Sequence, residues 1–142
     1  MEELLELRQY VEQGRYGEAL SLIGEMEEMS KEDKINKIYS FAEILLLHLI
    51  KRAAEKRATR SWELSIRNAV RQIRFVNRRR HAGGTYLTEA ELREVIAEAY
   101  PAALDRAALE AFEGRYEEDE LGRMADRAAL EQEALELITA AG

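Results

Sequence analysis

His48 is the first candidate for a residue with acid–base or metal chemistry. It lies inside the apolar run 44–50, and histidine titrates near neutral pH and is the commonest metal ligand among side chains. The carboxylates with which it could pair are Glu25 and Glu27. A buried pair of histidine and glutamate would shift both pKa values, so an enzyme or a metal protein using these residues is one hypothesis.

The spacing of the carboxylates around His48 argues against a metal ion. Carboxylate-bridged sites in helical bundles use a Glu-x-x-His pair that projects from one helix face. Glu43 precedes His48 by five residues, which is about 500° around a helix, so the two do not share a face. We predict no metal and no cofactor. We favour a structural role for His48, which would donate to a neighbouring helix or to a carboxylate such as Glu25.

A basic stripe is the second candidate site. Four arginines recur at helical spacing: Arg67, Arg71, Arg74 and Arg78. Arg79 and Arg80 extend this stripe, which could contact the phosphates of a nucleic acid. The stripe lacks interleaved aromatic residues for stacking bases, and no recognition-helix pattern accompanies it. We therefore favour pairing with acidic helices of the same chain or simple solvation, then an acidic protein partner, and last a nucleic acid.

The motif Arg60-Ser61-Trp62 is the third candidate. An arginine and a serine beside a tryptophan could line a small pocket. In the simpler alternative, Thr59 or Ser61 caps a helix and Trp62 packs against the leucines of the preceding helix. We favour the simpler alternative.

Two helical stretches must position these residues. Residues 31–57 form a predicted helix that is apolar on nearly every side, and such a helix needs cover on nearly every side. Residues 61–81 form a second predicted helix, with Trp62, Ile66 and Ile73 on one apolar stripe. We expect the first helix at the centre of a bundle and the second packed against it.

The remainder of the chain is also rich in helix-forming residues. Glu, Leu, Ala and Arg dominate its 142 residues, proline occurs once, and there are few runs typical of strands. Ser30 is expected to begin the central helix, and Gly24 to mark a close approach of two helices. The predicted fold is an all-α bundle of five to seven helices in one domain, 1–142. A peripheral position for 114–142, or contact with another copy, is an open alternative.

Charge and composition limit the class of protein. The net charge is −7, and the chain contains no cysteine. The segment 51–81 carries 11 basic and 2 acidic residues, whereas both flanking segments are acidic. The first residues lack the pattern of a signal peptide, and the longest apolar run is too short to cross a bilayer. We expect a cytoplasmic protein without membrane contact.

Three short runs also resemble a known family. They are Leu22-Ile23-Gly24-Glu25-Met26-Glu27 to Met29, Leu46-Leu47-His48-Leu49-Ile50-Lys51, and Arg60-Ser61-Trp62 to Ser65-Ile66-Arg67. They resemble a bacterial family known as domain-of-unknown-function family twenty-nine, over roughly 12–113. Gly24 stands where the family usually has a second glutamate, and Arg52 where it usually has tryptophan. The resemblance implies an all-helical fold and a bacterial, cytoplasmic setting, and it implies no reaction.

The leading functional hypothesis is a non-enzymatic interaction or structural module that binds an acidic partner or associates with itself. The sequence contains no nucleotide-binding loop, serine triad, zinc motif or dinucleotide fingerprint. The enzyme or metal hypothesis at His48 and the nucleic-acid hypothesis at 67–80 remain as alternatives.

Overall fold

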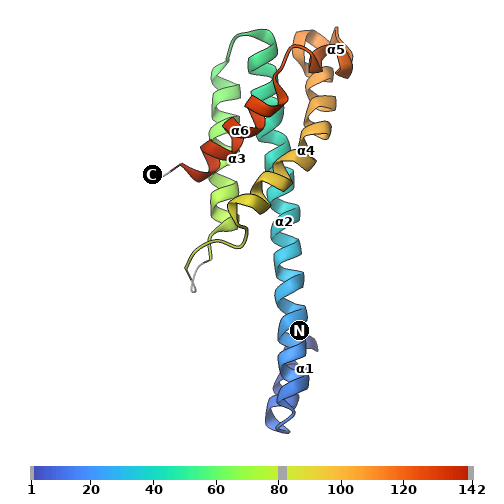
Figure 1. Cartoon of the computed structure of the whole chain (residues 1–142), viewed down its shortest axis with the longest axis vertical. Coiled ribbons are helices and arrows are strands. Elements are labelled where there is room, and N and C mark those ends of the chain that lie inside the picture. The colour runs from blue at the N-terminus through green and yellow to red at the C-terminus, as the bar shows by residue number, and fades with distance from the viewer. Residues whose placement is uncertain (1, 80–82, 141–142) are drawn as a thin grey trace. The chain divides into compact units, whose positions relative to one another are not determined.

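The computed structural model describes residues 2–79 and 83–140, and apart from one isolated bridge every regular element in these ranges is helical (Figure 1). The elements are α1 (Glu2–Glu12), α2 (Tyr16–Glu55), α3 (Arg60–Asn77), α4 (Glu89–Glu110), the 3₁₀ helix η1 (Ala111–Gly114), α5 (Glu118–Gly122) and α6 (Arg127–Thr139). The predicted all-α fold and its number of helices are confirmed.

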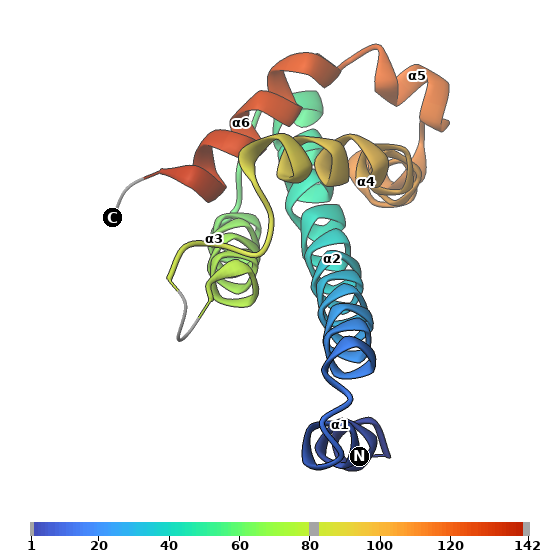
Figure 2. The ribbon, with the colours of Figure 1, turned by 60° about the horizontal axis from the view of Figure 1, so that its bottom comes forward.

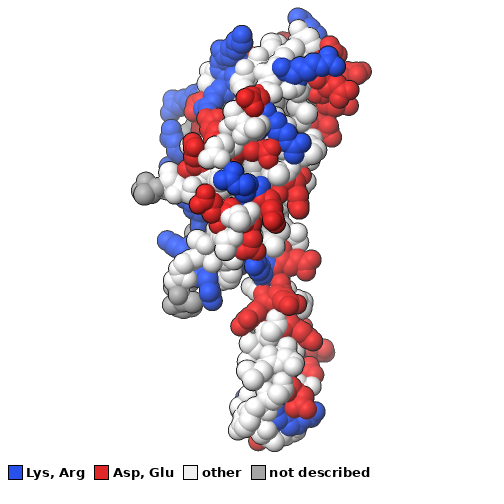
Figure 3. Space-filling view, viewed as in Figure 1, with Lys and Arg blue, Asp and Glu red and all other residues white. Residues whose placement is uncertain are grey.

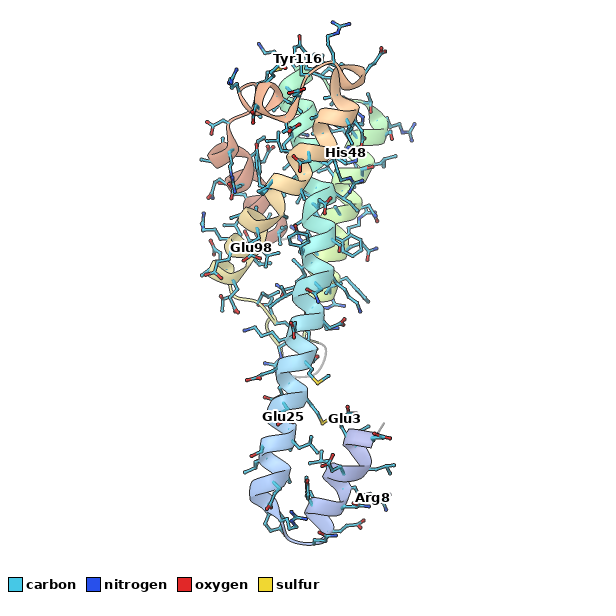
Figure 4. The ribbon with its side chains drawn as sticks, turned by 90° about the vertical axis from the view of Figure 1, so that its right-hand side faces the viewer. Glu3, Arg8, Glu25, His48, Glu98 and Tyr116 are labelled. Atoms are coloured by element: carbon cyan, nitrogen blue, oxygen red, sulfur yellow. The ribbon has the colours of Figure 1, made fainter. Side chains whose placement is uncertain are left out.

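The chain divides into two compact units, Met1–Lys34 and Ile35–Gly142, and helix α2 contributes to both. In the first unit, α1 folds back beside the first turns of α2 (Figure 4). The turn between them uses Gly14 with a φ of 72°, as expected for a glycine after a helix C-terminus. Ala19 and Leu22 are the buried apolar residues of this hairpin, and α1 contributes none.

Helix α2 continues through Ser30, where the sequence predicted that a new helix would begin. Ser30 is an exposed residue inside the helix, so its hydroxyl caps nothing. No glycine or proline lies near Ser30, and the lysine and glutamate that follow are good helix formers, so backbone hydrogen bonding simply continues. Gly24 is also inside α2, and a Cβ at Gly24 would meet no atom within 4 Å, so the expected close helix approach is wrong.

The core of the second unit surrounds the C-terminal half of α2. Its most deeply buried side chains there are Ile38, Ala42, Leu45, Leu46, Leu49 and Ile50. One hydrophobic cluster joins them to residues of α3, α4, α5 and α6. Figure 2 shows α3, α4 and α6 grouped around this half of α2. The prediction of a central apolar helix is therefore confirmed, although the helix begins upstream of residue 31.

The C-terminal stretch 114–142, for which a peripheral position was an open alternative, contributes to the same core. Leu121 of α5 and Leu130, Leu135 and Ile138 of α6 are buried. Helix α6 packs on α4 and α3. Pro101, the one proline of the sequence, lies inside the single helix α4.

Helix α3 begins one residue earlier than predicted and ends at Asn77, while Arg80 and His81 lie outside the described residues. Its N-cap is Thr59, whose hydroxyl accepts a 3.1 Å hydrogen bond from the backbone N–H of Trp62. Ser61 is therefore not the cap. Trp62 is 9% exposed, and two cations lie over its ring, with Lys51 Nζ 4.7 Å and the Arg57 guanidinium 4.8 Å from the ring centroid.

We predict that Trp62→Ala lowers the free energy of unfolding by about 3–5 kcal/mol, because it empties a buried aromatic site and removes two cation–π contacts. Chemical denaturation measures this change. Leu64→Ala is the control on the same helix, because Leu64 is 48% exposed and its loss should cost about 0.5 kcal/mol or less. Equal effects of the two substitutions would show that Trp62 does not anchor α3.

Candidate anion-binding surface

Two of the arginines near α3 are fully engaged inside the second unit. Arg74 donates hydrogen bonds to the backbone carbonyls of Leu137, Ile138 and Ala140 at 2.7–2.9 Å. The last carbonyls of a helix lack intrahelical partners and form the negative end of its dipole, so a guanidinium stabilises the end of α6. Arg74 therefore has a structural role in the described fold.

Arg52 is the second engaged arginine. Its guanidinium donates to Glu63 at 2.9 Å and to Glu133 at 2.8 Å, which connects α2 to both α3 and α6. Arg52 stands where the resembled family usually has tryptophan, and a planar five-donor group can bridge two carboxylates in this way. Its charge is therefore balanced within the unit.

Three other arginines are not engaged in this way. They are Arg67, Arg71 and Arg78, which we call the arginine crest. All three are exposed, and within 2–79 and 83–140 they make neither an ion pair nor a hydrogen bond through their side chains. The favoured interpretation was pairing with acidic helices of the same chain or simple solvation. Among the described residues, the crest arginines are solvated and do not pair with those helices. Figure 3 shows basic side chains along the outer side of α3.

Two grooves with apolar floors adjoin the crest on the side of α6. One of about 370 Å³ is bordered by Arg67 and Arg71, and its floor includes Ile66, Val70 and Leu137. The other, of about 410 Å³, is bordered by Arg78 and has a floor of Leu87, Leu92 and Ile138. Arg74 lines both grooves.

Exposed apolar side chains lie on the other side of the crest. Leu64 is 48% and Phe75 is 55% exposed. Leu64 precedes Arg67 by three residues and Phe75 follows Arg71 by four, so both are helix-face neighbours of the crest. The expectation that no aromatic residue accompanies the arginines is wrong at Phe75. This neighbour could have been found in the sequence, because Phe75 follows Arg71 by four residues on the same predicted helix.

This arrangement suits an anionic, partly apolar ligand. Each guanidinium of the crest offers planar donors to a carboxylate, and the adjoining apolar surfaces offer contact area for the carbon atoms beside it. Binding would not require the loss of an existing ion pair of the crest within the described residues.

His48 offers little chemistry in comparison (Figure 4). It is half-buried, and its buried Nδ1 atom has no hydrogen-bond partner in the described part of the chain. Burial lowers the pKa of His48 below its ordinary 6.5, Lys51 and Arg106 lower it further, and Glu110 partly opposes them. The imidazole is therefore neutral at pH 7. Among the cavities bordered by described residues, four have volumes of about 300–560 Å³, and His48 lines none of these four.

The other predicted site residues are dispersed. Glu25 and Glu27 are exposed residues of the first unit, whereas His48 belongs to the second, and their pairing stays a prediction. Arg60 and Ser61 are exposed and border none of the four cavities. Trp62 lines a cavity of about 300 Å³ together with Arg57 and Glu110.

The described residues contain no group of three or more His, Cys, Asp or Glu side chains that could hold a metal ion. No helix within them is long and apolar enough to cross a membrane.

The fold and this surface define an all-α protein with a basic helix face. A family model described as "Domain of unknown function DUF29" matches residues 18–120, and the chain belongs to this family. The family predicted from the three sequence runs is thereby confirmed. No curated protein and no solved structure matches the chain.

We predict that His48 makes the folded protein less stable as the pH falls from about 7 to 5. Its pKa is lowered in the folded state, so the unfolded chain takes up a proton first, near the ordinary value of 6.5. The contribution of His48 to the free energy of unfolding is therefore fully present above this pH. It decreases as the pH falls toward the pKa of His48 in the folded state. His48→Leu should flatten this pH dependence in denaturation curves. An unchanged slope would show that His48 is protonated equally in both states.

Proposed function

We propose that this protein is a non-enzymatic interaction module that binds an acidic segment of a partner protein along the arginine crest. The observation that carries the proposal is the contrast among the arginines. Arg52 and Arg74 are satisfied inside the fold, whereas Arg67, Arg71 and Arg78 have no carboxylate partner among the described residues.

The spacing of the crest favours a helical or extended acidic segment. Arg67 and Arg78 are eleven residues apart, which is about 16 Å along a helix. A partner with carboxylates over three helical turns could contact all three guanidiniums. Its apolar residues would meet Leu64 and Phe75 or enter the grooves beside α6.

A nucleic acid is less well supported as the partner. The three guanidiniums of the crest are few compared with the six to ten phosphate contacts typical of DNA-binding proteins. A bacterial, cytoplasmic setting is part of the same proposal and rests on the family resemblance and the absence of cysteine.

A labelled helical peptide of roughly 15 residues, with Glu and Leu alternating at offsets of three and four, tests this proposal by fluorescence anisotropy. We expect binding that weakens with added salt, because exposed charge pairs are screened. Arg67→Glu together with Arg71→Glu should weaken binding about tenfold or more.

The matched control is Arg115→Glu with Arg123→Glu, which makes the same change of charge at two exposed arginines that line neither of the grooves beside the crest. This control should keep nearly the affinity of the parent protein. Single-stranded DNA of equal length is the competing probe. Equal losses in both double variants, or tighter binding of the DNA, would refute an acidic-protein site on α3.

A further inference from the structure

The helical hairpin of the first unit exposes an unusual number of large apolar side chains. Seven of them are between 37% and 69% exposed: Leu4, Leu5, Val11, Tyr16, Leu20, Ile23 and Met29. Figure 3 shows a surface over the beginning of α2 with few charged side chains. Contiguous apolar surface of this kind marks an interaction site more often than it marks a free surface.

Three of these residues form a stripe on α2. Tyr16, Leu20 and Ile23 recur at offsets of zero, four and seven, which places them on one helix face. The next position of that stripe is Glu27, an exposed carboxylate with no ion pair among the described residues. The stripe therefore combines apolar side chains with a free negative charge.

The charge of this hairpin is opposite to that of α3. Residues 2–34 contain ten acidic and four basic side chains, a balance of −6. Residues 60–79 contain six basic and one acidic side chain, a balance of +5. Both surfaces also present exposed apolar residues, which are Tyr16 and Leu20 on the hairpin and Leu64 and Phe75 on α3.

We propose that the hairpin of one copy docks on the arginine crest of a second copy of the chain. The inference rests on the proposed function and names the acidic partner of the same surface. In the interface, carboxylates beside the Tyr16–Ile23 stripe, Glu27 among them, pair with the free guanidiniums of the crest. The apolar stripe covers Leu64 and Phe75.

Charge also selects this arrangement over contact between two hairpins. A symmetric hairpin pair would bring together two surfaces that each carry −6, and like charges in an interface are unfavourable. The hairpin-to-crest contact joins unlike surfaces, so it is heterologous, and further copies can add until a ring closes.

Two full-length variants test the inference in analytical ultracentrifugation. One blocks the crest with Arg67→Glu, Arg71→Glu and Arg78→Glu. The other blocks the stripe with Leu20→Lys and Glu27→Lys, both at exposed positions. We expect the parent protein to self-associate with concentration, and each variant alone to associate about tenfold or more weakly. An equimolar mixture should form a heterodimer, because each variant keeps the surface that the other has lost.

The control for the stripe is Ser21→Lys with Glu28→Lys, which adds the same charge about 100° around the helix and should associate like the parent protein. A monomeric parent at all concentrations, or a crest variant that still dimerises alone, would overturn the inference. If the parent is monomeric but the crest still binds the Glu and Leu peptide, the proposed function stands and only self-assembly fails.

Discussion

The fold depends on the need to cover the C-terminal half of α2. From Ile38 to Ile50 this helix has buried apolar side chains in nearly every direction, so a single neighbouring helix could not remove them from water. Helices α3, α4 and α6 provide this cover together. Each covering helix also has sides that face away from α2, and the functional possibilities of the second unit lie on those outer sides.

The position of each α3 arginine relative to α6 explains why, in the described part of the chain, Arg74 is hydrogen-bonded and the crest arginines are not. Arg74 lies on the side of α3 that faces α6, where unsatisfied carbonyls accept its hydrogen bonds. Arg71 and Arg78 lie about 40–60° further around the helix, beyond the reach of these carbonyls. One stripe in the sequence thus contains a structural residue and residues that are free to bind. The acidic residues of α6 do not neutralise the crest, because Glu133 binds Arg52.

Much of the fold could be predicted from the sequence, because its main signals are local. The apolar density of 42–50 identified the core helix, and the stripe from Trp62 to Ile73 identified the buried side of α3. The continuity of α2 through Ser30 was missed, because a capping residue predicts a helix start only where the preceding residues leave the helix. The contacts of Arg52 and Arg74 were also out of reach. They depend on the position of α6, more than sixty residues away in the sequence.

The central claim is that the crest is free in the isolated chain and becomes occupied when an acidic segment binds. NMR of the arginine Nε–H groups measures this directly in the variant with Leu20→Lys and Glu27→Lys, whose crest is intact. The account predicts that the Nε–H of Arg74, which donates to the carbonyl of Ile138 at 2.9 Å, exchanges slowly with solvent before and after the Glu and Leu peptide is added. It predicts that Arg67, Arg71 and Arg78 exchange rapidly alone, then shift and slow with the peptide. Slow exchange at the crest without the peptide, or shifts confined to other arginines, would contradict it.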